Sequence, residues 1–228
     1  MKIYFIPGLG ASSACFKFIS LPSGFEKVYI DWFTPEGHET LEEYTHKMAE
    51  TIDTSEPFIL TGYSFGGVIV QEMNKFLKPE KTILIASMKN NEQIPAFFKF
   101  VQKIRFVKWF PMSFFSNEGL LFYFFARAVY FRARMKEEFK LKEYMSQGNP
   151  SYMKWSINAI TQWRSTIKCR NLYQIHGTKD IVFPYKQIRK SYNSENGSYL
   201  ETIEGASHIL VLEKPKKVNK ALENILLA

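Results

Sequence analysis

Short apolar runs recur along the chain and are separated by stretches in which apolar residues return at helical spacing. Six of these runs have the length and character of β-strands: residues 2–6, 26–31, 58–61, 82–86, 172–175 and 199–203. Strands that alternate with helices favour a parallel sheet. The pattern therefore predicts an α/β fold with a mostly parallel central sheet of about six strands flanked by helices.

Two helices are defined by their apolar faces. Residues 41–53 carry one such face, and Thr40 and Glu43 stand in a capping-box relation at its start. A last helix begins near Pro215, which the first turn of a helix tolerates. Core positions on these helices are Leu41, Tyr44, Met48 and Ile52 in the first, and Val218, Leu222, Ile225 and Leu226 in the last.

The segment 88–168 interrupts the alternation with helical stretches and no evident strand. We interpret it as an inserted helical cap, so that residues 1–87 and 169–228 form the α/β core. Of the 21 Phe residues, 12 lie between Phe97 and Phe139. The segment also holds 14 Lys and Arg against 5 Asp and Glu, and therefore accounts for the net charge of +8. Cations stand between the aromatic residues at Lys99, Lys103, Arg105, Lys108, Arg127, Arg132 and Arg134.

Aromatic and basic residues together can bind nucleic acid, but no nucleic-acid-binding motif accompanies them, and we expect no nucleic-acid partner. Two interpretations of the basic segment stay open. It is the solvated face of a lid, or it makes a weak contact with an anionic membrane surface or an anionic group of the substrate.

The length and composition place the chain among single-domain proteins, with 228 residues of which 46% are hydrophobic. Cys15 and Cys169 are expected to be free thiols, because two cysteines make no disulfide framework. The N-terminal apolar stretch is cut short by Pro7 and Gly8, unlike a signal peptide, so a cytoplasmic location is expected. The apolar stretch 119–126 is too short to span a membrane. No oligomeric state can be assigned.

A Gly-x-Ser-x-Gly pattern follows the third predicted strand, with its members at Gly62, Ser64 and Gly66. Apolar residues at helical spacing come directly after it, at Val70, Met73 and Leu77. A strand, a sharp turn and a helix in this order are typical of a nucleophile elbow, which holds a serine hydroxyl clear of the sheet. We therefore predict that Ser64 is a nucleophile on an exposed turn.

A serine nucleophile needs a base that accepts its proton and an acid that orients the base. In the order serine, acid, histidine, both partners follow Ser64. Asp180 is the only Asp beyond the serine, and His208 is the only His beyond Asp180. Each lies in a loop after a predicted strand, where parallel sheets place functional groups. The alternatives are a turn-forming role for Asp180 and a capping or surface role for His208.

The other three histidines are assigned no catalytic role. His176 lies at the end of a predicted buried strand and before the acid, which favours a structural hydrogen bond. His38 and His46 precede the serine and are expected to be solvated.

Acyl transfer also needs donors for the oxyanion of the tetrahedral intermediate. One candidate is the backbone N–H of Phe65, at the positive end of the helix after the elbow. The second candidate is the N–H of Leu9, in the glycine turn after the first strand. An ordinary glycine turn is the alternative for the latter.

These residues resemble the α/β-hydrolase superfamily. The resemblance rests on Pro7-Gly8-Leu9-Gly10, residues 62–67 at the elbow, Gly177-Thr178-Lys179-Asp180 and Gly205-Ala206-Ser207-His208. It covers nearly the whole chain outside the cap, and implies a helical lid inserted after the fourth strand, as in small capped carboxylesterases. The chain departs from the family in lacking the antiparallel strands that usually open the fold, and in carrying Pro7 where a histidine often precedes the oxyanion glycine.

The sequence thus predicts a serine hydrolase that cleaves carboxylic esters or thioesters with apolar acyl groups, without cofactor or metal. The aromatic cap motivates the apolar substrate. An acyltransferase or carbon–carbon bond hydrolase with the same residues is the alternative among enzymes. An inactive ligand-binding member of the fold is the alternative outside them.

Overall fold

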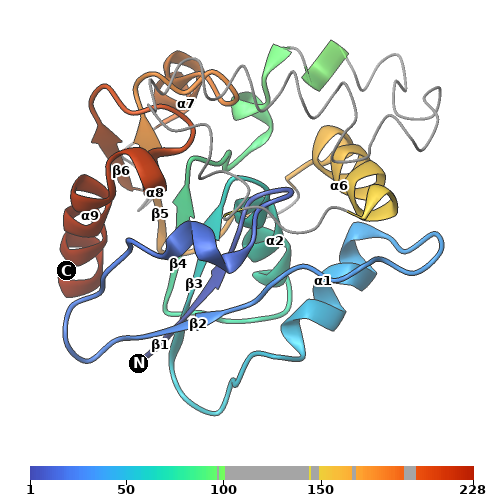
Figure 1. The fold of residues 1–228 in the computed structure, drawn as a ribbon, viewed down its shortest axis with the longest axis horizontal. Coiled ribbons are helices and arrows are strands. Elements are labelled where there is room, and N and C mark those ends of the chain that lie inside the picture. Colours follow the sequence, from blue (N-terminus) through green and yellow to red (C-terminus); the bar gives the residue numbers. More distant parts are fainter. Residues whose placement is uncertain (97, 101–143, 145–148, 166–167, 193–198) are drawn as a thin grey trace.

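The structure is a computed structural model in which residues 1–96, 98–100, 144, 149–165, 168–192 and 199–228 are described. Its centre is a six-stranded sheet in the order β2-β1-β3-β4-β5-β6 (Figure 1). Every neighbouring pair of strands is parallel. The predicted parallel sheet of about six strands is therefore confirmed.

The strands lie where the apolar runs placed them, with ends that shift by one or two residues. Their bounds are Lys2–Ile6 (β1), Glu26–Tyr29 (β2), Phe58–Tyr63 (β3), Lys81–Ile85 (β4), Leu172–Gly177 (β5) and Tyr199–Ile203 (β6). All six residues of β3 are buried, because helices cover both faces of this central strand. The edge strand β2 has no fully buried residue.

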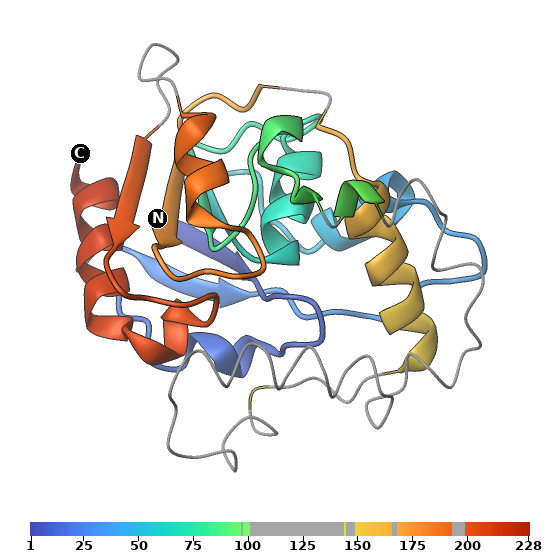
Figure 2. The same ribbon diagram turned by 90° about the horizontal axis from the view of Figure 1, so that it is seen from above.

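Helices form a layer on each face of the sheet (Figure 2). The core on one face includes residues of α1 (Leu41–Ala49), α2 (Phe65–Met73), α6 (Pro150–Gln162) and α7 (Tyr185–Lys190). The core on the other face includes residues of the 3-10 helix η1 (Ser13–Phe16), α8 (Leu210–Glu213) and α9 (Pro215–Leu227). In β1, β3 and β4, successive apolar residues alternate between the two cores, as the period of a β-strand requires.

Helix α1 confirms the predicted capping box but ends earlier than predicted. Thr40 accepts a hydrogen bond from the Glu43 N–H, and the Glu43 side chain accepts one from the Thr40 N–H. The helix ends at Ala49, where the Glu50 N–H turns to the carbonyl groups of Lys47 and Met48. Ile52 lies beyond the end of the helix but is still buried. Its place in the apolar pattern therefore reflects burial in the core, not helical structure.

The chain reverses its direction across the sheet between β1 and β3. From β1 it runs outward to β2 on one side, and after β3 it continues through β4, β5 and β6 on the other. Ile6 pairs with Gly62, so the loops that leave β1 and β3 start side by side. In open α/β sheets, ligands bind at such a switch point, at the carboxyl ends of the strands.

Most of the predicted cap, residues 88–168, lies outside the described residues. Within it, the structure describes the 3-10 helix η2 (Asn91–Gln93) and α6, which is tied to the loop before α1 by a hydrogen bond from Trp155 Nε1 to the Glu39 carbonyl. The division into core and cap stays a prediction. The apolar stretch 119–126 is likewise undescribed, and in the described ranges no helix has the length and apolar content of a membrane span.

Candidate active site

Ser64 lies at a sharp turn between the end of β3 and the start of α2. Its backbone is in the left-handed region, with φ of 53° and ψ of −117°, a conformation that L residues avoid unless the surroundings impose it. A Cβ at Gly66 would collide with the Ile6 carbonyl oxygen, so only glycine lets α2 start this close to β1. The predicted nucleophile elbow is therefore present as a geometric feature.

The Ser64 side chain is less accessible than the sequence predicted. Only 9% of the residue is exposed, whereas an exposed turn was expected. His208 is 4% exposed and Asp180 is 5% exposed. The prediction of an exposed serine was wrong, because Gly8 and His208 pack against Ser64 from other loops.

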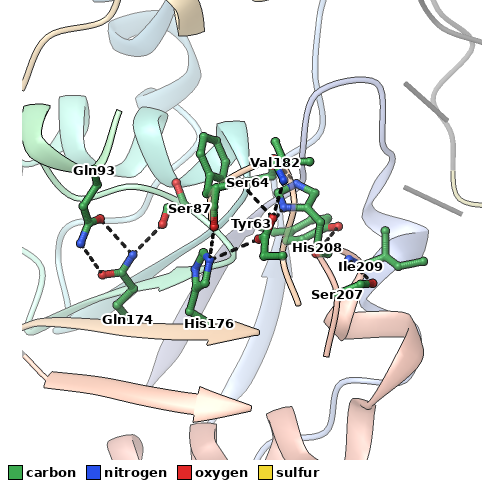
Figure 3. Close-up of polar contacts among 12 residues, drawn as sticks. Tyr63, Ser64, Ser87, Gln93, Gln174, His176, Val182, Ser207, His208 and Ile209 are labelled. Carbon is green, nitrogen blue, oxygen red and sulfur yellow. Dashed lines mark hydrogen bonds and ion pairs between the residues drawn. The ribbon is translucent and has the colours of Figure 1, made fainter. Parts of the chain in front are cut away.

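His208 bridges Ser64 and Asp180 through its two ring nitrogens. Figure 3 shows His208 beside Ser64. The Nε2 of His208 lies 2.9 Å from Ser64 Oγ, and its Nδ1 lies 2.8 Å from Asp180 Oδ2. A carboxylate only accepts, so Nδ1 donates and the neutral ring presents Nε2 as an acceptor to the serine hydroxyl. The three residues that the sequence singled out by their order are thus brought into one chain of hydrogen bonds.

The imidazole of His208 is held by its neighbours. The Tyr63 hydroxyl donates to the His208 carbonyl at 3.2 Å, and the Tyr63 ring lies 5.8 Å from the imidazole. The Phe183 ring lies 5.6 Å from it. These aromatic contacts restrict the ring to the orientation in which both nitrogens have partners.

Asp180 is a buried acceptor of several hydrogen bonds. Its Oδ1 accepts from the Val182 and Phe183 N–H groups at 2.8 and 2.9 Å. Burial by itself raises the pKa of the Asp180 carboxyl, but His208 and the hydrogen bonds outweigh it, and the net pKa lies below its ordinary value. Asp180 is therefore ionised at neutral pH, beside the ring nitrogen that it orients.

The loops that carry the acid and the histidine are fastened to each other. The Lys179 N–H donates to the Ala206 carbonyl at 2.8 Å, and the Gly205 N–H donates to Thr178 Oγ1 at 2.8 Å. Both loops leave neighbouring strands, since Gly177 of β5 pairs with Ile203 of β6. This cross-bracing fixes the distance between Asp180 and His208.

His176 has the structural role that the sequence predicted. Its ring is fully buried, and Nε2 donates to the Phe183 carbonyl at 2.8 Å. The same nitrogen lies 3.3 Å from Asp180 Oδ2. Burial lowers the pKa of His176, which keeps the ring neutral. His38 and His46 are exposed, as expected.

Amide side chains form a second buried hydrogen-bond network, beside the one that contains His176 (Figure 3). Gln174, on β5, donates to the Ser87 carbonyl at 2.6 Å and to Gln93 Oε1 at 3.1 Å. Gln71 donates to the Met88 carbonyl at 2.8 Å. The network holds the chain after β4 against β5 and α2, and so supports the floor under the elbow.

The two predicted oxyanion donors belong to segments that adjoin Ser64. Phe65 is the first residue of α2, where backbone N–H groups have no partner within the helix. Gly8 packs directly against Ser64: a Cβ on Gly8 would stand 3.2 Å from Ser64 Cβ. The turn 8–11, which we call the oxyanion turn, is closed by a hydrogen bond from the Ala11 N–H to the Gly8 carbonyl at 3.0 Å. The Leu9 N–H donates to no other residue that the structure describes.

Aromatic side chains line the oxyanion turn and the start of α2, a feature that the sequence analysis missed. Trp32 stacks on Phe65, with ring centroids 5.3 Å apart. Tyr152 and Trp155 of α6 pack on Trp32 and Phe65 respectively. The only signal in the sequence was an isolated Trp directly after a short strand.

Both cysteine thiols have pKa values above their ordinary range because they are buried, and Cys15 lies against the backbone of Gly8. Cys15 and Cys169 are free, and burial raises the pKa of the Cys169 thiol to about 12. Among the described residues, no group of three or more His, Cys, Asp or Glu side chains could hold a metal ion.

A parallel sheet with a serine at a strand-to-helix elbow, and with an acid and a histidine after later strands, defines the class of α/β-hydrolases. The sequence profile of the Alpha/beta hydrolase family matches residues 3–221, so the chain belongs to this family. The superfamily and the enzyme class that the sequence predicted, a hydrolase, are thereby confirmed. No curated protein sequence matched the chain.

Solved structures with the same fold cover nearly the whole chain. An esterase from Thermogutta terrifontis with bound malate has 15% identity and a TM-score of 0.74, covering 100% of this chain and 89% of its own. MenH from S. aureus has 14% identity and a TM-score of 0.77, with coverages of 100% and 93%. The enol-lactonase from Burkholderia xenovorans LB400 has 17% identity and a TM-score of 0.72, with coverages of 100% and 91%. At these identities the likeness concerns the fold alone.

Proposed function

We propose that this hydrolase cleaves carboxylic esters or thioesters through a Ser64–His208–Asp180 triad and an acyl-enzyme. The observation that carries the proposal is the continuous chain of contacts from Ser64 Oγ to His208 Nε2, at 2.9 Å, and from His208 Nδ1 to Asp180 Oδ2, at 2.8 Å. Both distances are within hydrogen-bond reach for proton transfer and for orientation of the base.

In the first half of the reaction, His208 Nε2 takes the proton of the Ser64 hydroxyl while Oγ attacks the carbonyl carbon of the ester. The carbonyl oxygen becomes an oxyanion, which accepts hydrogen bonds from the N–H groups of Leu9 and Phe65. The intermediate then collapses, the bond to the alcohol or thiol breaks, and His208 returns its proton to the leaving group. Ser64 is left as an acyl ester.

In the second half, His208 takes a proton from a water molecule, whose oxygen attacks the acyl carbon. The bond to Ser64 Oγ breaks, Ser64 recovers the proton from His208, and the carboxylic acid leaves. Asp180 stays ionised throughout, because its lowered pKa keeps it a carboxylate that stabilises the imidazolium.

The expected acyl group is apolar. In the described part of the chain, the aromatic side chains of Trp32 and Tyr152 pack beside the residues that carry the donors. An esterase and an enol-lactonase are among the structures with the same fold, which supports chemistry on a carboxylic ester or lactone. The Phe residues that first motivated this substrate class lie mostly outside the described residues.

Labelling with a fluorophosphonate tests the proposal, because the probe reacts only with an activated serine. We expect labelling of the wild-type protein at Ser64, and none of Ser64→Ala. Folded wild-type protein that resists the probe would instead favour an inactive, ligand-binding member of the family.

Acyl transfer and carbon–carbon bond hydrolysis remain the alternatives, since both use the same three residues. Acyl transfer can be distinguished from hydrolysis by incubating wild-type enzyme that reacts with the probe with a p-nitrophenyl ester, in the presence and absence of an added alcohol. Release of free acid in equal amounts under both conditions supports hydrolysis, whereas conversion to the new ester supports a transferase.

A weak contact of the basic segment with anionic membrane surfaces, and a cytoplasmic location, are further proposals. Co-sedimentation with vesicles that contain anionic lipid, compared with neutral vesicles at low and high salt, tests the contact. Equal sedimentation with both kinds of vesicle would contradict it.

A further inference from the structure

Trp32 makes a hydrogen bond that bears directly on the oxyanion turn. The residue follows β2, and its indole Nε1–H donates to the Gly8 carbonyl oxygen at 2.9 Å. The same oxygen accepts the Ala11 N–H at 3.0 Å. The Gly8 carbonyl therefore accepts two hydrogen bonds, one from within the oxyanion turn and one from the loop after β2.

The Gly8 carbonyl and the Leu9 N–H belong to the same peptide group. Because that group is planar and trans, its C=O and N–H point in opposite directions and turn together. A donor that anchors the oxygen therefore also sets the direction of the N–H. Hydrogen bonds at the oxygen also polarise the group, which strengthens the N–H as a donor.

The ring of Trp32 also contacts the residue that carries the other donor. It stacks on the Phe65 ring with an angle of 14° between the planes, and Tyr152 packs on it at 5.5 Å. Trp32 thus contacts the oxyanion turn through a hydrogen bond and the first residue of α2 through a ring stack.

We propose that Trp32 is a positioning residue for the oxyanion site: it orients the Gly8–Leu9 peptide so that the Leu9 N–H points to the substrate oxyanion. The inference rests on the proposed function, since it needs Ser64 to form a tetrahedral intermediate. It adds a residue from the loop after β2 to a site otherwise built after β1, β3, β5 and β6.

The variant Trp32→Phe removes the indole N–H and keeps an aromatic ring against Phe65. Complete loss of one oxyanion donor costs about 10²- to 10³-fold in kcat, so a misdirected donor is expected to cost about 10- to 100-fold. KM should change less than about threefold, because the oxyanion exists only after the attack. If Trp32 were purely structural, its replacement would lower stability without lowering kcat selectively over KM.

Trp155→Phe is the matched control. Trp155 belongs to the same aromatic cluster, and its Nε1 donates to a backbone carbonyl at 2.8 Å, but that carbonyl is Glu39 and lies outside the oxyanion turn. This variant loses an indole–carbonyl hydrogen bond of the same kind. We expect its kcat to stay within about threefold of the wild type, because no oxyanion donor depends on it.

A thionoester provides a readout specific to the oxyanion. Sulfur accepts hydrogen bonds poorly, so an enzyme with well-aimed N–H donors prefers p-nitrophenyl butyrate over its thiono analogue. Trp32→Phe should reduce this ratio of kcat/KM, and Trp155→Phe should leave it unchanged. An unchanged ratio in folded Trp32→Phe would overturn the inference.

Two outcomes need to be told apart. If wild-type protein neither reacts with the fluorophosphonate nor turns over the ester, the proposed function fails first. If the wild type is active and both Trp variants behave alike, only the role of Trp32 fails. Should Trp32→Phe not fold, benzothienylalanine introduced at position 32 keeps the two-ring shape without the N–H, and the same ratio decides.

Discussion

Replacement of Ser64 by glycine should stabilise the protein relative to replacement by alanine, while both variants lose activity. The two variants lack the hydroxyl, and so lose the same contact with His208. They differ in the backbone, because Ser64 stands at φ 53° and ψ −117°, where a Cβ is strained and glycine is not.

The expected difference follows from two opposing terms. Backbone strain of this kind costs about 1–3 kcal/mol in a residue with a Cβ. Glycine in place of alanine gives the unfolded chain more freedom, which lowers stability by about 0.4–1 kcal/mol. Relief of strain is the larger effect, so the free energy of unfolding of Ser64→Gly should exceed that of Ser64→Ala by about 0.5–2 kcal/mol.

Urea unfolding of the two variants measures the difference, and thermal melts should separate by about 2–4 °C for each kcal/mol in a chain of this size. Asn158 provides a control of opposite sign, since it is exposed in the middle of α6, where glycine is less stable than alanine by about 1 kcal/mol. If alanine were the more stable residue at position 64, the turn would store no strain and the argument would fail.

Other predictions concern the acid and the buried histidine. Asp180→Asn should lower kcat on p-nitrophenyl esters by about 10⁴-fold with the fold intact, since an amide cannot hold the required tautomer of His208; a loss below about tenfold would point to another acid. Because the pKa of His176 is lowered in the folded protein, His176 is protonated at a higher pH in the unfolded chain than in the folded one. Its contribution to stability is therefore complete above about pH 6.5 and is lost progressively below it. Unfolding free energies at pH 7.5 and 5.5 should differ less in His176→Gln than in the exposed-site control His38→Gln, and equal differences would contradict this.

Much of the fold was predictable because its elements are local. Five-residue apolar runs and helical spacing follow from side-chain burial along a strand or a helix, so the strands and α9 were found within one or two residues. The end of α1 was not, because Ile52 is buried without being helical. The spacing of apolar residues indicates which positions are buried, and does not by itself show where a helix ends.

The site was predictable as a set of residues, and not as an arrangement. Ser64 was marked by its glycines, and Asp180 and His208 by the scarcity of Asp and His after the serine. The low exposure of Ser64 was missed, because it depends on loops that come from distant parts of the chain. Trp32 was missed for the same reason: its partner, Gly8, is 24 positions away and carries no matching sequence signal.

The sequence by itself determined which chemical groups the protein has and the order in which the chain presents them. The tertiary structure alone decided that β1 and β3 are neighbours, which sets the oxyanion turn against Ser64. It also decided that β5 and β6 pair, which places Asp180 and His208 within one hydrogen bond. The physical reason is that strand pairing is non-local: it depends on how the helices cover both faces of the sheet, and no short stretch of residues carries that information.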